Sequence, residues 1–431
     1  MSAERRRIAV VGGGVAGLTA AYVLQRSCDV TLYEADGRLG GHAHTHELSG
    51  ELSGAQPSGA DAALTRVDSG FIVHNDRTYP LLTRLFRELD VTVQDAEMSM
   101  SVRCDGCGLQ YAGARGPGAL FAGRRSLDPR YLRMLAEVPV FHRGARRLLR
   151  ERGDADGRTL GRFLADGGFS PYFTSHFALP LVSCVWSCPS GTALDYPAAY
   201  LFRFLDHHGL LSVTGSPQWK TVTGGSARYV ERIAKQLTAV RTDSPVSAVR
   251  RLSDGVRVST AGGESDDYAG VVVAVHPDQA LRLLADAGDA EREVLGAFRY
   301  SRNPTVLHTD PTLLPTRPRA RASWNYLMSD CAAGDEGVRV TYDMGRLQRL
   351  PAPARYYVSL NATARVDPAK VLAEMVYEHP VYTPESVAAQ RRLPELNTPV
   401  TAFAGAYHGW GFHEDGCRSG VAAAASLGVT W

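Results

Sequence analysis

Three glycines near the N-terminus have the spacing of a phosphate-binding turn. The apolar residues 8–11 predict a short buried parallel strand, which leads into Gly12, Gly14 and Gly17 at GxGxxG spacing. Gly12 permits a tight turn, and Gly14 lets a pyrophosphate approach the backbone. Gly17 lets the helix expected over residues 16–25 lie close to the strand. The N-terminus of that helix offers free N–H groups and a partial positive charge to phosphates.

An acidic residue follows at the distance that a dinucleotide requires. Residues 30–33 predict the next strand, and Glu34 closes it about 20 residues after the glycines. There a carboxylate accepts hydrogen bonds from a ribose 2′-hydroxyl, which disfavours a 2′-phosphorylated nucleotide. The strand, the glycine turn, the helix and the acid together predict a dinucleotide-binding site.

The motif Arg38-Leu39-Gly40-Gly41 indicates which dinucleotide binds. It resembles the second glycine pair of the flavoprotein superfamily that includes flavin amine oxidases, phytoene desaturases and protoporphyrinogen oxidase. In that superfamily the pair lies against the pyrophosphate and ribityl chain, so the resemblance implies FAD. His42 then occupies the position where many relatives carry an arginine against the cofactor. The implied fold is α/β, with a Rossmann-like FAD-binding domain and an interleaved α+β substrate domain, as in amine oxidases.

Two internal stretches extend the resemblance. Residues 67–71, Val-Asp-Ser-Gly-Phe, resemble the superfamily strand that passes over the flavin ring, where Gly70 would leave room for the ring face. Residues 219–237 resemble the turn and helix that return the chain to the nucleotide domain. The strand that begins at 245 would then place the backbone of Val246 against the adenine. We expect the strands at 256–259 and 271–275 to complete a small sheet with it. His276-Pro277 is interpreted as a strand end.

The C-terminal stretch 403–427 resembles the superfamily helix that lies under the pyrimidine end of the flavin. We expect a closing strand over 402–405 and a helix that has Asp415 as its N-cap, runs to 427 and stops at Gly428. Reduction places negative charge on this end of the flavin, which N–H groups near Gly416 and the helix dipole would stabilise. Ala406 stands where relatives often have an acidic residue.

The residues predicted to bind FAD come from all these motifs. They are Gly12, Gly14, Val15, Ala16, Gly17, Glu34, Ala35, Arg38, Gly40, Gly41, His42, Gly70, Phe71, Val246, Gly405, Asp415 and Gly416.

The loop before the last helix supplies the catalytic candidates, because it should stand at the edge of the flavin ring. They are His413, Trp410 and His408. A histidine is suited to general acid or base catalysis because its ordinary pKa lies near neutrality. The alternative is a structural hydrogen-bond donor.

Two patterns leave a metal site open as an alternative. His42, His44 and His46 would share one face of an extended strand, and Cys104 and Cys107 form a CxxC in a hairpin expected over 98–113 with a two-residue Asp-Gly turn. Further thiols could come from the pair at 184 and 188. We predict no metal, because the histidines lack a fourth ligand and the second cysteine pair has unusual spacing in an apolar segment. The seven cysteines are expected to be reduced thiols.

The middle of the chain predicts an apolar substrate. Residues 127–211 have helical periodicity, with an arginine-rich outer face over 131–150, and aromatic residues crowd 169–204. Most of these are core, but the cluster could also line an apolar tunnel. The following segment predicts strands over 305–308, 323–328, 338–343 and 356–361. Amine oxidases of the superfamily carry a lysine on the first of these strands, where it holds a water near flavin N5. Here that stretch is Asn303-Pro304-Thr305-Val306, which disfavours amine oxidation.

Length and composition set outer bounds. The 431 residues predict two domains, and a net charge of +2 without a concentrated basic face excludes a nucleic-acid-binding protein. No stretch of uncharged apolar residues is long enough for a membrane span, and the N-terminus does not have the pattern of a signal peptide. We therefore expect a cytoplasmic protein with at most peripheral membrane contact. Residues 49–64 read as a surface loop. The FAD-binding domain is expected over 1–95, 215–290 and 399–431, and the substrate domain over 96–214 and 291–398.

The whole pattern resembles a bacterial branch of predicted NAD/FAD-binding proteins that is associated with modification of membrane fatty-acyl chains. This implies an FAD-dependent oxidoreductase that abstracts hydride from an apolar substrate, with fatty-acyl desaturation as the leading version and oxygen or a carrier as the oxidant. The alternatives are a redox-neutral double-bond isomerase, an amine oxidase, and a non-catalytic flavin-binding partner of a lipid-modifying enzyme. The sequence does not indicate the substrate, the electron acceptor or the oligomeric state.

Overall fold

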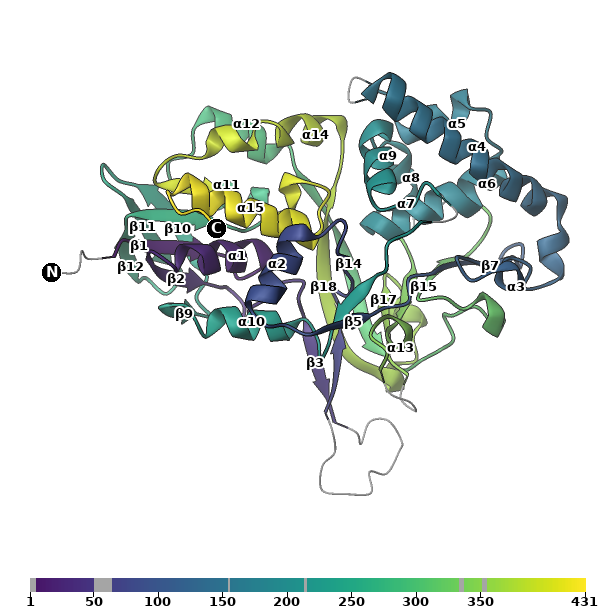
Figure 1. Cartoon of the computed structure of the whole chain (residues 1–431), viewed down its shortest axis with the longest axis horizontal. Coiled ribbons are helices and arrows are strands. Elements are labelled where there is room, and N and C mark those ends of the chain that lie inside the picture. The colour runs from purple at the N-terminus through teal and green to yellow at the C-terminus, as the bar shows by residue number, and fades with distance from the viewer. Residues whose placement is uncertain (1–4, 50–63, 154–155, 213–214, 333–336, 351–354) are drawn as a thin grey trace.

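The computed structural model describes residues 5–49, 64–153, 156–212, 215–332, 337–350 and 355–431. The surface loop expected at 49–64 therefore lies almost wholly outside the described residues. Figure 1 shows two lobes: one is built on a parallel sheet with helices on both sides, and the other combines a large sheet with a helical cluster.

The first lobe contains a five-stranded parallel sheet with the order β19-β13-β1-β2-β9. Its strands come from four separate parts of the chain, and all neighbours pair in parallel. This confirms the Rossmann-like α/β fold. The strands are β1 (Arg7–Val11), β2 (Asp29–Tyr33), β9 (Ala239–Arg241), β13 (Gly270–Val273) and β19 (Thr401–Phe403).

The position of β13 corrects one expectation. Residues 271–275 were expected to join the strand at 256–259 in a small sheet, but β13 lies between β1 and β19 in the parallel sheet. All four residues of β13 are buried, as in a parallel strand that is covered on both faces. The small antiparallel sheet contains instead β10 (Val246–Arg251), β11 (Val256–Thr260) and β12 (Ser265–Tyr268).

Four helices of this lobe pack on one another, because α1 contacts both α15 and α10, and α15 contacts α2. Helix α1 follows β1 directly and α15 follows β19, and the two lie side by side (Figure 1). These helices are α1 (Val15–Leu24), α2 (Pro80–Glu88), α10 (Ala227–Ala234) and α15 (His413–Ser426). Three further helices of this lobe are α11 (Pro277–Leu283), α12 (Asp289–Gly296) and α14 (Pro384–Gln390).

The second lobe is built on a seven-stranded sheet with the order β18-β14-β17-β16-β15-β6-β7. The expected hairpin over 98–113 and the expected strands between 305 and 361 are confirmed, but the 11-residue β18 was not foreseen. The strands are β6 (Met100–Cys104), β7 (Gln110–Gly113), β14 (Arg299–His308), β15 (Trp324–Met328), β16 (Val340–Asp343), β17 (Tyr357–Leu360) and β18 (Val371–Val381).

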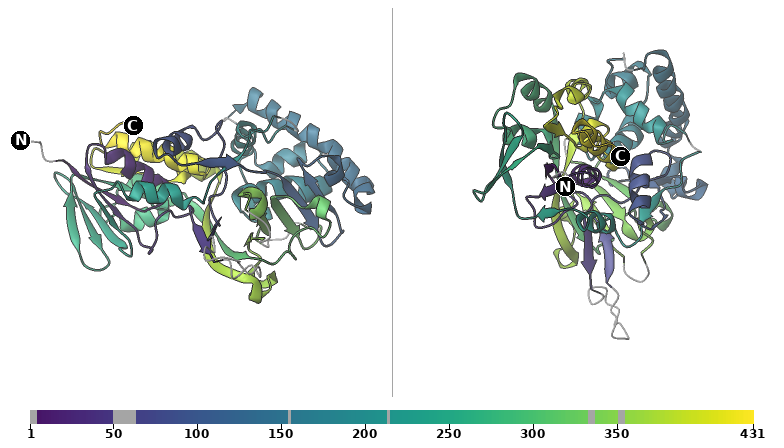
Figure 2. Two further views of the ribbon diagram at one scale, coloured as in Figure 1. Left: turned by 60° about the horizontal axis from the view of Figure 1, so that its bottom comes forward. Right: turned by 60° about the vertical axis from the view of Figure 1, so that its left-hand side comes forward.

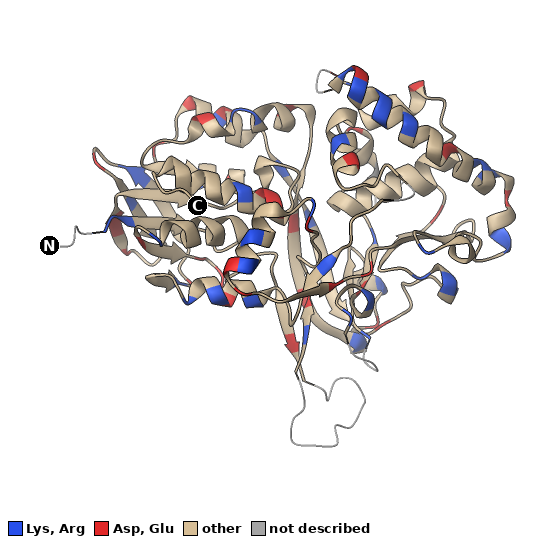
Figure 3. Ribbon diagram, in the orientation of Figure 1, with Lys and Arg blue, Asp and Glu red and all other residues tan. Residues whose placement is uncertain are grey.

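A helical cluster packs on this sheet and shares its largest core (Figure 2). Its longest helix is amphipathic as expected: Tyr131, Met134, Phe141, Ala145 and Leu148 are buried, and arginines follow its outer face (Figure 3). The helices are α3 (Pro117–Leu120), α4 (Pro129–Glu151), α5 (Leu160–Asp166), α6 (Pro171–Phe173), α7 (Leu179–Trp186), α8 (Ser190–Leu194) and α9 (Ala198–His207), with α13 (Met344–Leu347) at the sheet.

Two short antiparallel pairs connect the lobes. They are β3 (Thr45–Leu48) with β4 (Thr65–Asp68), and β5 (Val93–Asp95) with β8 (Lys220–Val222). None of the described helices is both long and apolar enough to cross a membrane.

Candidate functional site

The first glycine turn has the geometry that the sequence predicts. Gly12 has a φ of +105°, and a Cβ on Gly17 would lie 1.9 Å from the carbonyl oxygen of Gly12. Strand β1 and helix α1 can therefore approach as they do only with glycine at these positions. Gly14 is different, because a Cβ there would meet no atom within 4 Å. The space beside Gly14 is thus free for a ligand.

The second glycine pair lies directly against the first turn. The Gly40 N–H donates to the Gly13 carbonyl at 2.8 Å, and the Cα of Gly14 lies 3.3 Å from where a Cβ of Gly41 would stand. Both Gly40 and Gly41 have positive φ, +110° and +55°. The Arg38 guanidinium donates to the Gly41 carbonyl at 2.9 Å, which holds this turn in place.

Glu34 stands at the end of β2 beside the glycine turn. Its carboxylate accepts the Gly13 N–H at 2.7 Å and the Asp36 N–H at 3.0 Å. The loop that leads to β10 passes here, because the Ser244 N–H donates to the Glu34 carbonyl at 2.9 Å. Glu34, the exposed Ala35 and the start of β10 at Val246 therefore lie at one end of the glycine turns, where the adenosine half of a dinucleotide is expected.

Helix α15 begins three residues earlier than predicted. Phe412 is the N-cap and His413 the first helical residue, whereas Asp415 is the third and accepts the Phe412 N–H at 3.1 Å. Asp415 also pairs with Arg418 at 2.5 Å. The N-cap prediction was wrong because an aspartate three residues inside a helix can bond back to the N-cap N–H. The predicted C-terminus is confirmed, since Gly428 follows the helix with a φ of +88°.

The N-termini of α1 and α15 lie next to one another. A Cβ on Gly416 would lie 2.6 Å from Val15 Cγ1, and one on Gly420 would lie 2.4 Å from the Ala16 carbonyl oxygen. Neither Gly14 nor Phe412 caps its helix with its own side chain, and Asp415 accepts only the N-cap N–H of Phe412. Within the described chain the N–H groups of the first helical residues therefore remain available in both helices. Two positive helix ends therefore face the region beside Gly14. Gly405 precedes α15 and donates its N–H to Ser419 Oγ at 2.9 Å.

Gly70 is required by the protein backbone itself. The predicted strand ends at Asp68, and residues 69–71 continue it by pairing with residues 42–44, with the Phe71 N–H 2.6 Å from the His42 carbonyl oxygen. A Cβ on Gly70 would lie 2.2 Å from that oxygen. A close backbone contact thus explains the glycine without the flavin ring.

The catalytic candidate His413 is buried against an aromatic ring. Its imidazole stacks on Phe71 with ring centres 3.7 Å apart, and burial lowers its pKa to about 3. Burial likewise lowers the pKa of His408 to about 4. Both rings are therefore neutral at pH 7, which removes the basis for predicting acid or base catalysis from an ordinary histidine pKa. The buried Nε2 atoms of both and the Trp410 Nε1 have no partner among the described residues.

His42 packs against two aromatic rings of β18. Its ring lies 4.9 Å from the ring of Tyr377 and 5.3 Å from that of His379, and its buried Nε2 has no partner in the described chain. Burial and the neighbouring His379 hold the pKa of His42 well below its usual value. His44 and His46 do share a face, with ring centres 4.1 Å apart, whereas His42 precedes β3 and shares only the neighbour Tyr377 with His44. His276 is the N-cap of α11, not a strand end.

The sequence did not predict the structural role of two acidic residues near the site. Asp68 is fully buried and accepts hydrogen bonds from Thr45, Ser226 and Gln348, which ties β4 to the start of α10. Glu414 accepts the Leu81 and Leu82 N–H groups at 3.1 and 2.9 Å, which caps α2. Burial raises the pKa of Asp68 to about 6 and that of Glu414 to about 7. No local pattern predicts these contacts, because their partners are far away in sequence.

An aromatic wall joins the start of α15 to the helical cluster. Phe204 lies 4.8 Å from Phe412 and 4.7 Å from Trp186 between ring centres, and the Trp186 indole N–H donates to the Trp410 carbonyl at 3.1 Å. We call Trp186, Phe204, Trp410 and Phe412 the aromatic wall. A cavity of about 20 Å³ lies beside it, between the end of α9 and the start of α15. The aromatic residues of the helical segment thus reach the predicted flavin side.

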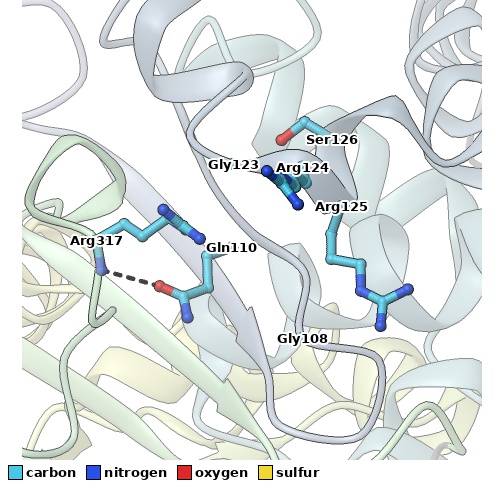
Figure 4. A pocket seen from close by; sticks show the side chains of 7 residues that line it. All are labelled: Gly108, Gln110, Gly123, Arg124, Arg125, Ser126 and Arg317. Carbon is cyan, nitrogen blue, oxygen red and sulfur yellow. Dashed lines mark hydrogen bonds between the residues drawn. The ribbon is translucent and has the colours of Figure 1, made fainter.

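A larger cavity of about 180 Å³ lies elsewhere, at the β7 edge of the second lobe (Figure 4). Arg124, Arg125 and Arg317 line it, and the Arg317 N–H donates to Gln110 Oε1 at 3.1 Å. None of the residues predicted to bind the cofactor lines this cavity.

The residues present fit FAD. The space beside Gly14, the two uncapped helix ends and the carboxylate of Glu34 suit a pyrophosphate and a ribose. The unpartnered imidazole nitrogens of His42 and His413 are buried polar atoms that a bound ligand can satisfy. In the predicted set, each oxygen of the Glu34 and Asp415 carboxylates already accepts one hydrogen bond from the protein, and Glu34 keeps the second lone pairs of its oxygens for a ribose hydroxyl.

Comparisons with known proteins agree with this geometry. A model of the family of flavin-containing amine oxidoreductases matches residues 15–307. Protoporphyrinogen oxidase 2 of Arabidopsis thaliana is 62% identical over 37 residues, which are 8% of this chain and 7% of that protein. The chain thus spans only a small part of that curated relative.

Solved structures share the fold over the full length. A CLA-producing fatty acid isomerase from P. acnes has a TM-score of 0.68 at 17% identity and covers 96% of this chain and 97% of its own. Cyclohexylamine oxidase from Brevibacterium oxydans IH-35A has a TM-score of 0.65 at 17% identity and covers 98% of both chains. The chain belongs to the family of flavin-containing amine oxidoreductases, and it is an FAD-dependent oxidoreductase.

Proposed function

We propose that this oxidoreductase abstracts hydride from an apolar substrate, and that the substrate is a fatty-acyl chain that becomes desaturated. The aromatic wall is the observation that carries the proposal. It places Trp410 and Phe412, directly before the helix that faces the flavin site, in contact with Trp186 and Phe204 of the helical cluster. Binding to such a surface is favourable for a hydrocarbon chain, because its apolar surface leaves water, and unfavourable for a charged amine, because the amine loses its hydration.

The electrostatics of the site support a neutral substrate. Burial lowers the pKa of His379 and of His408 to about 4 and that of His413 to about 3, so these rings carry no charge at pH 7. The carboxylates of Glu414 and Asp415 are held by N–H groups of α2 and by Arg418. An ammonium group would therefore find these carboxylates already engaged.

Strand β14 supports the same view. Asn303 stands in the stretch where amine oxidases of the family carry a lysine, and it is buried. Its amide donates to His379 Nδ1 at 3.0 Å, and its Oδ1 accepts the Asn361 amide at 2.7 Å. Asn303 is thus committed to the strand, and it carries no amine that could act on a water.

Bound FAD would supply the hydride acceptor. The protein's own contribution is to hold the chain against the aromatic wall, to exclude water, and to direct the uncapped N-terminus of α15 at the site of developing negative charge. Of the two hydrogens removed in a desaturation, one leaves as hydride and the other as a proton to solvent, and oxygen or a carrier then takes the electrons. The fatty acid isomerase with the same fold shows that this architecture can hold an acyl chain in another protein.

We also propose that the protein touches a membrane from which the acyl chain is drawn. Phe121 and Leu127 are 47% and 70% exposed at the start of the helical cluster, and Arg124 and Arg125 lie between them. Exposed apolar side chains flanked by arginines suit an anionic lipid surface. Sedimentation with anionic vesicles tests this: binding should fall when Phe121 and Leu127 are both changed to Ser, and equal binding by this variant would contradict it.

The decisive experiment is anaerobic reduction of the protein-bound flavin. Fatty acids, phospholipids and a panel of amines are added separately, the flavin absorbance is followed, and the lipids are analysed by mass spectrometry. Bleaching by lipid with a product two mass units lighter is expected. Bleaching by amines alone would overturn the proposal.

Two other outcomes identify the alternatives. A shifted double bond without net bleaching would identify a redox-neutral isomerase. Turnover only after a second lipid-modifying enzyme is added would identify a flavin-binding partner.

A further inference from the structure

Four side chains that commonly ligate metals converge in the second lobe, away from the flavin site. They are Cys104, Cys107, His176 and Cys331, and their ligand atoms all lie within 4.8 Å of one another. Cys104 ends β6 and Cys107 lies in the turn to β7. His176 lies in a single π-helical turn, Thr174–Ala178, and Cys331 follows β15. Three segments far apart in sequence thus meet at one point.

Two distances in this group match the edges of a tetrahedron around zinc. With Zn–S of about 2.3 Å and Zn–N of about 2.0–2.1 Å, a tetrahedral site has S–S edges of about 3.8 Å and S–N edges of about 3.6 Å. The sulfurs of Cys104 and Cys331 are 3.8 Å apart, and the sulfur of Cys107 is 3.6 Å from His176 Nε2. A disulfide requires about 2.0 Å, and all these cysteines are free thiols.

The turn between Cys104 and Cys107 is built to present both sulfurs. The Cys107 and Leu109 N–H groups donate to the sulfurs of Cys104 and Cys107, respectively. A Cβ on Gly106 would lie 2.8 Å from the Asp330 Cα, so glycine allows the turn to approach the segment that carries Cys331. The Asp105 N–H donates to the Met328 carbonyl at 2.9 Å, which locks the two segments together.

His176 is oriented for ligation through Nε2. Its Nδ1 lies 2.8 Å from Ser175 Oγ and 3.3 Å from the Tyr172 carbonyl oxygen, so this nitrogen can carry the proton. Nε2 is then the lone-pair nitrogen, and it is the atom that faces Cys107. Tyr172 stacks on the imidazole with ring centres 3.9 Å apart, which fixes the ring plane. π-Helical turns are often retained at functional sites because they place one side chain out of the helical register.

We propose that Cys104, Cys107, His176 and Cys331 bind one structural Zn²⁺ ion. Three thiolates and one imidazole in tetrahedral array select zinc among the common divalent ions, and four protein ligands leave no open position for catalysis. The ion joins the β6–β7 hairpin and the end of β15 to the helical cluster. It thereby stabilises the lobe that carries the aromatic wall, and it is independent of the flavin chemistry.

The proposed site departs from the prediction of no metal, and its ligands differ from those of the alternative in which Cys184 and Cys188 supply two thiols. The CxxC is one half of the site, as the alternative in the sequence supposed, but Cys184 and Cys188 are not the other half. Cys184 lies inside α7 and Cys188 just after it, and both are buried outside the group. The other two ligands, His176 and Cys331, lie outside the CxxC motif, and no local sequence pattern predicts them.

The test measures metal in the purified holoprotein. Protein is produced without an affinity tag that binds metal, and zinc and flavin are both quantified. We expect about one zinc per chain. Release by a mercurial reagent should free the same amount to a colorimetric chelator, and cobalt substitution should give the absorption of tetrahedral thiolate ligation. Absence of zinc in flavin-replete protein, or iron in its place, would overturn the proposal.

Variants separate ligation from general instability. Cys331→Ser and Cys107→Ser should lose most of the zinc and melt at lower temperature, whereas Cys28→Ala, a buried free thiol in the other lobe, should keep it. Full zinc content in a Cys107→Ser, Cys331→Ser double variant would contradict the assignment. Should these variants fail to fold, mass spectrometry of the alkylated wild type decides: protection of the three cysteine thiols that is lost when zinc is removed supports the site, and a Cys104–Cys107 or Cys104–Cys331 disulfide refutes it.

Discussion

Four helix N-termini lie around the flavin site, and they fall into two pairs. The start of α2 is capped by Glu414 and the start of α10 by Asp68 and Thr45, in each case by side chains distant in sequence. At the starts of α1 and α15 the N–H groups of the first helical residues have no side-chain acceptor in the described part of the chain, because Asp415 accepts only the N-cap N–H of Phe412. We call the first pair closed and the second pair open.

The difference teaches how stability and binding are divided in this lobe. A closed end has its N–H groups satisfied by the protein and holds the fold, which is worth about 1 kcal/mol per cap. An open end leaves N–H groups for a ligand and gives up that stabilisation. The two open ends lie together, at Val15 and Gly416, and this is where the glycine turns leave free space.

The largest expected effect separates two glycines of the open end. Gly17→Val should lower the free energy of unfolding by at least about 3 kcal/mol, because its Cβ would lie 1.9 Å from the Gly12 carbonyl oxygen. Gly14→Val should leave the stability of the apoprotein within about 1 kcal/mol, because nothing lies within 4 Å of its Cβ, yet it should abolish FAD binding. Chemical denaturation and flavin content measure both. Full FAD occupancy in Gly14→Val would show that the space beside Gly14 does not hold the cofactor.

The next effect tests the closed end of α10. Asp68→Asn should lower the free energy of unfolding by about 2 kcal/mol. The new amide NH2 group would face the Gln348 amide and the Thr45 hydroxyl, which now donate hydrogen bonds to the carboxylate. Denaturant unfolding of the apoprotein measures the loss without interference from the cofactor. A change below about 0.5 kcal/mol would show that the network is not a cap.

The pH dependence of stability follows from the same carboxylate. Burial raises the pKa of Asp68 from 3.8 to about 6, so the folded state holds this proton more tightly than the unfolded state. Its contribution is therefore full below pH 3.8 and is lost as the pH rises through 6. Unfolding free energies measured at several pH values should show this fall for the wild type and a smaller one for Asp68→Asn. Equal slopes would contradict the assignment.

A smaller effect is expected at the closed end of α2. Glu414→Gln should lower stability by about 1 kcal/mol, because an amide offers one acceptor oxygen where the carboxylate offers two. Thermal unfolding of the apoprotein measures it, and the flavin content should stay at the wild-type level. A loss of flavin with unchanged stability would instead move Glu414 to the open group.

The smallest effect concerns chemistry at the open end of α15. His413→Phe keeps the stack on Phe71, and a neutral imidazole is a poor acid or base at pH 7, so the rate of flavin reduction by the lipid substrate should fall less than about tenfold. Stopped-flow absorbance with equal flavin loading measures this rate. A loss of about a hundredfold or more would restore His413 as an acid–base catalyst.

The predictions from sequence succeeded where one short segment determines its own geometry. The turn at Gly12 and Gly17, the helix after it and the stop at Gly428 depend on φ angles and close contacts within a few residues. They failed at Asp415, because an aspartate can cap a helix either as its N-cap residue or as its third helical residue. Only the packing of α15 decides which of these positions Asp415 takes. The sequence also assigned Gly70 to the flavin, although the His42 backbone already requires it.

The sequence by itself determined the cofactor class and the parallel-sheet lobe, because glycine spacing, strand length and a carboxylate at a fixed distance are local properties of the chain. Only the tertiary structure decided which residues cap α2 and α10, which rings form the aromatic wall, and which four side chains surround the proposed zinc ion. The physical reason is the same in each case. These contacts join residues dozens to hundreds of positions apart, and their free energy depends on burial and distance that no local pattern records.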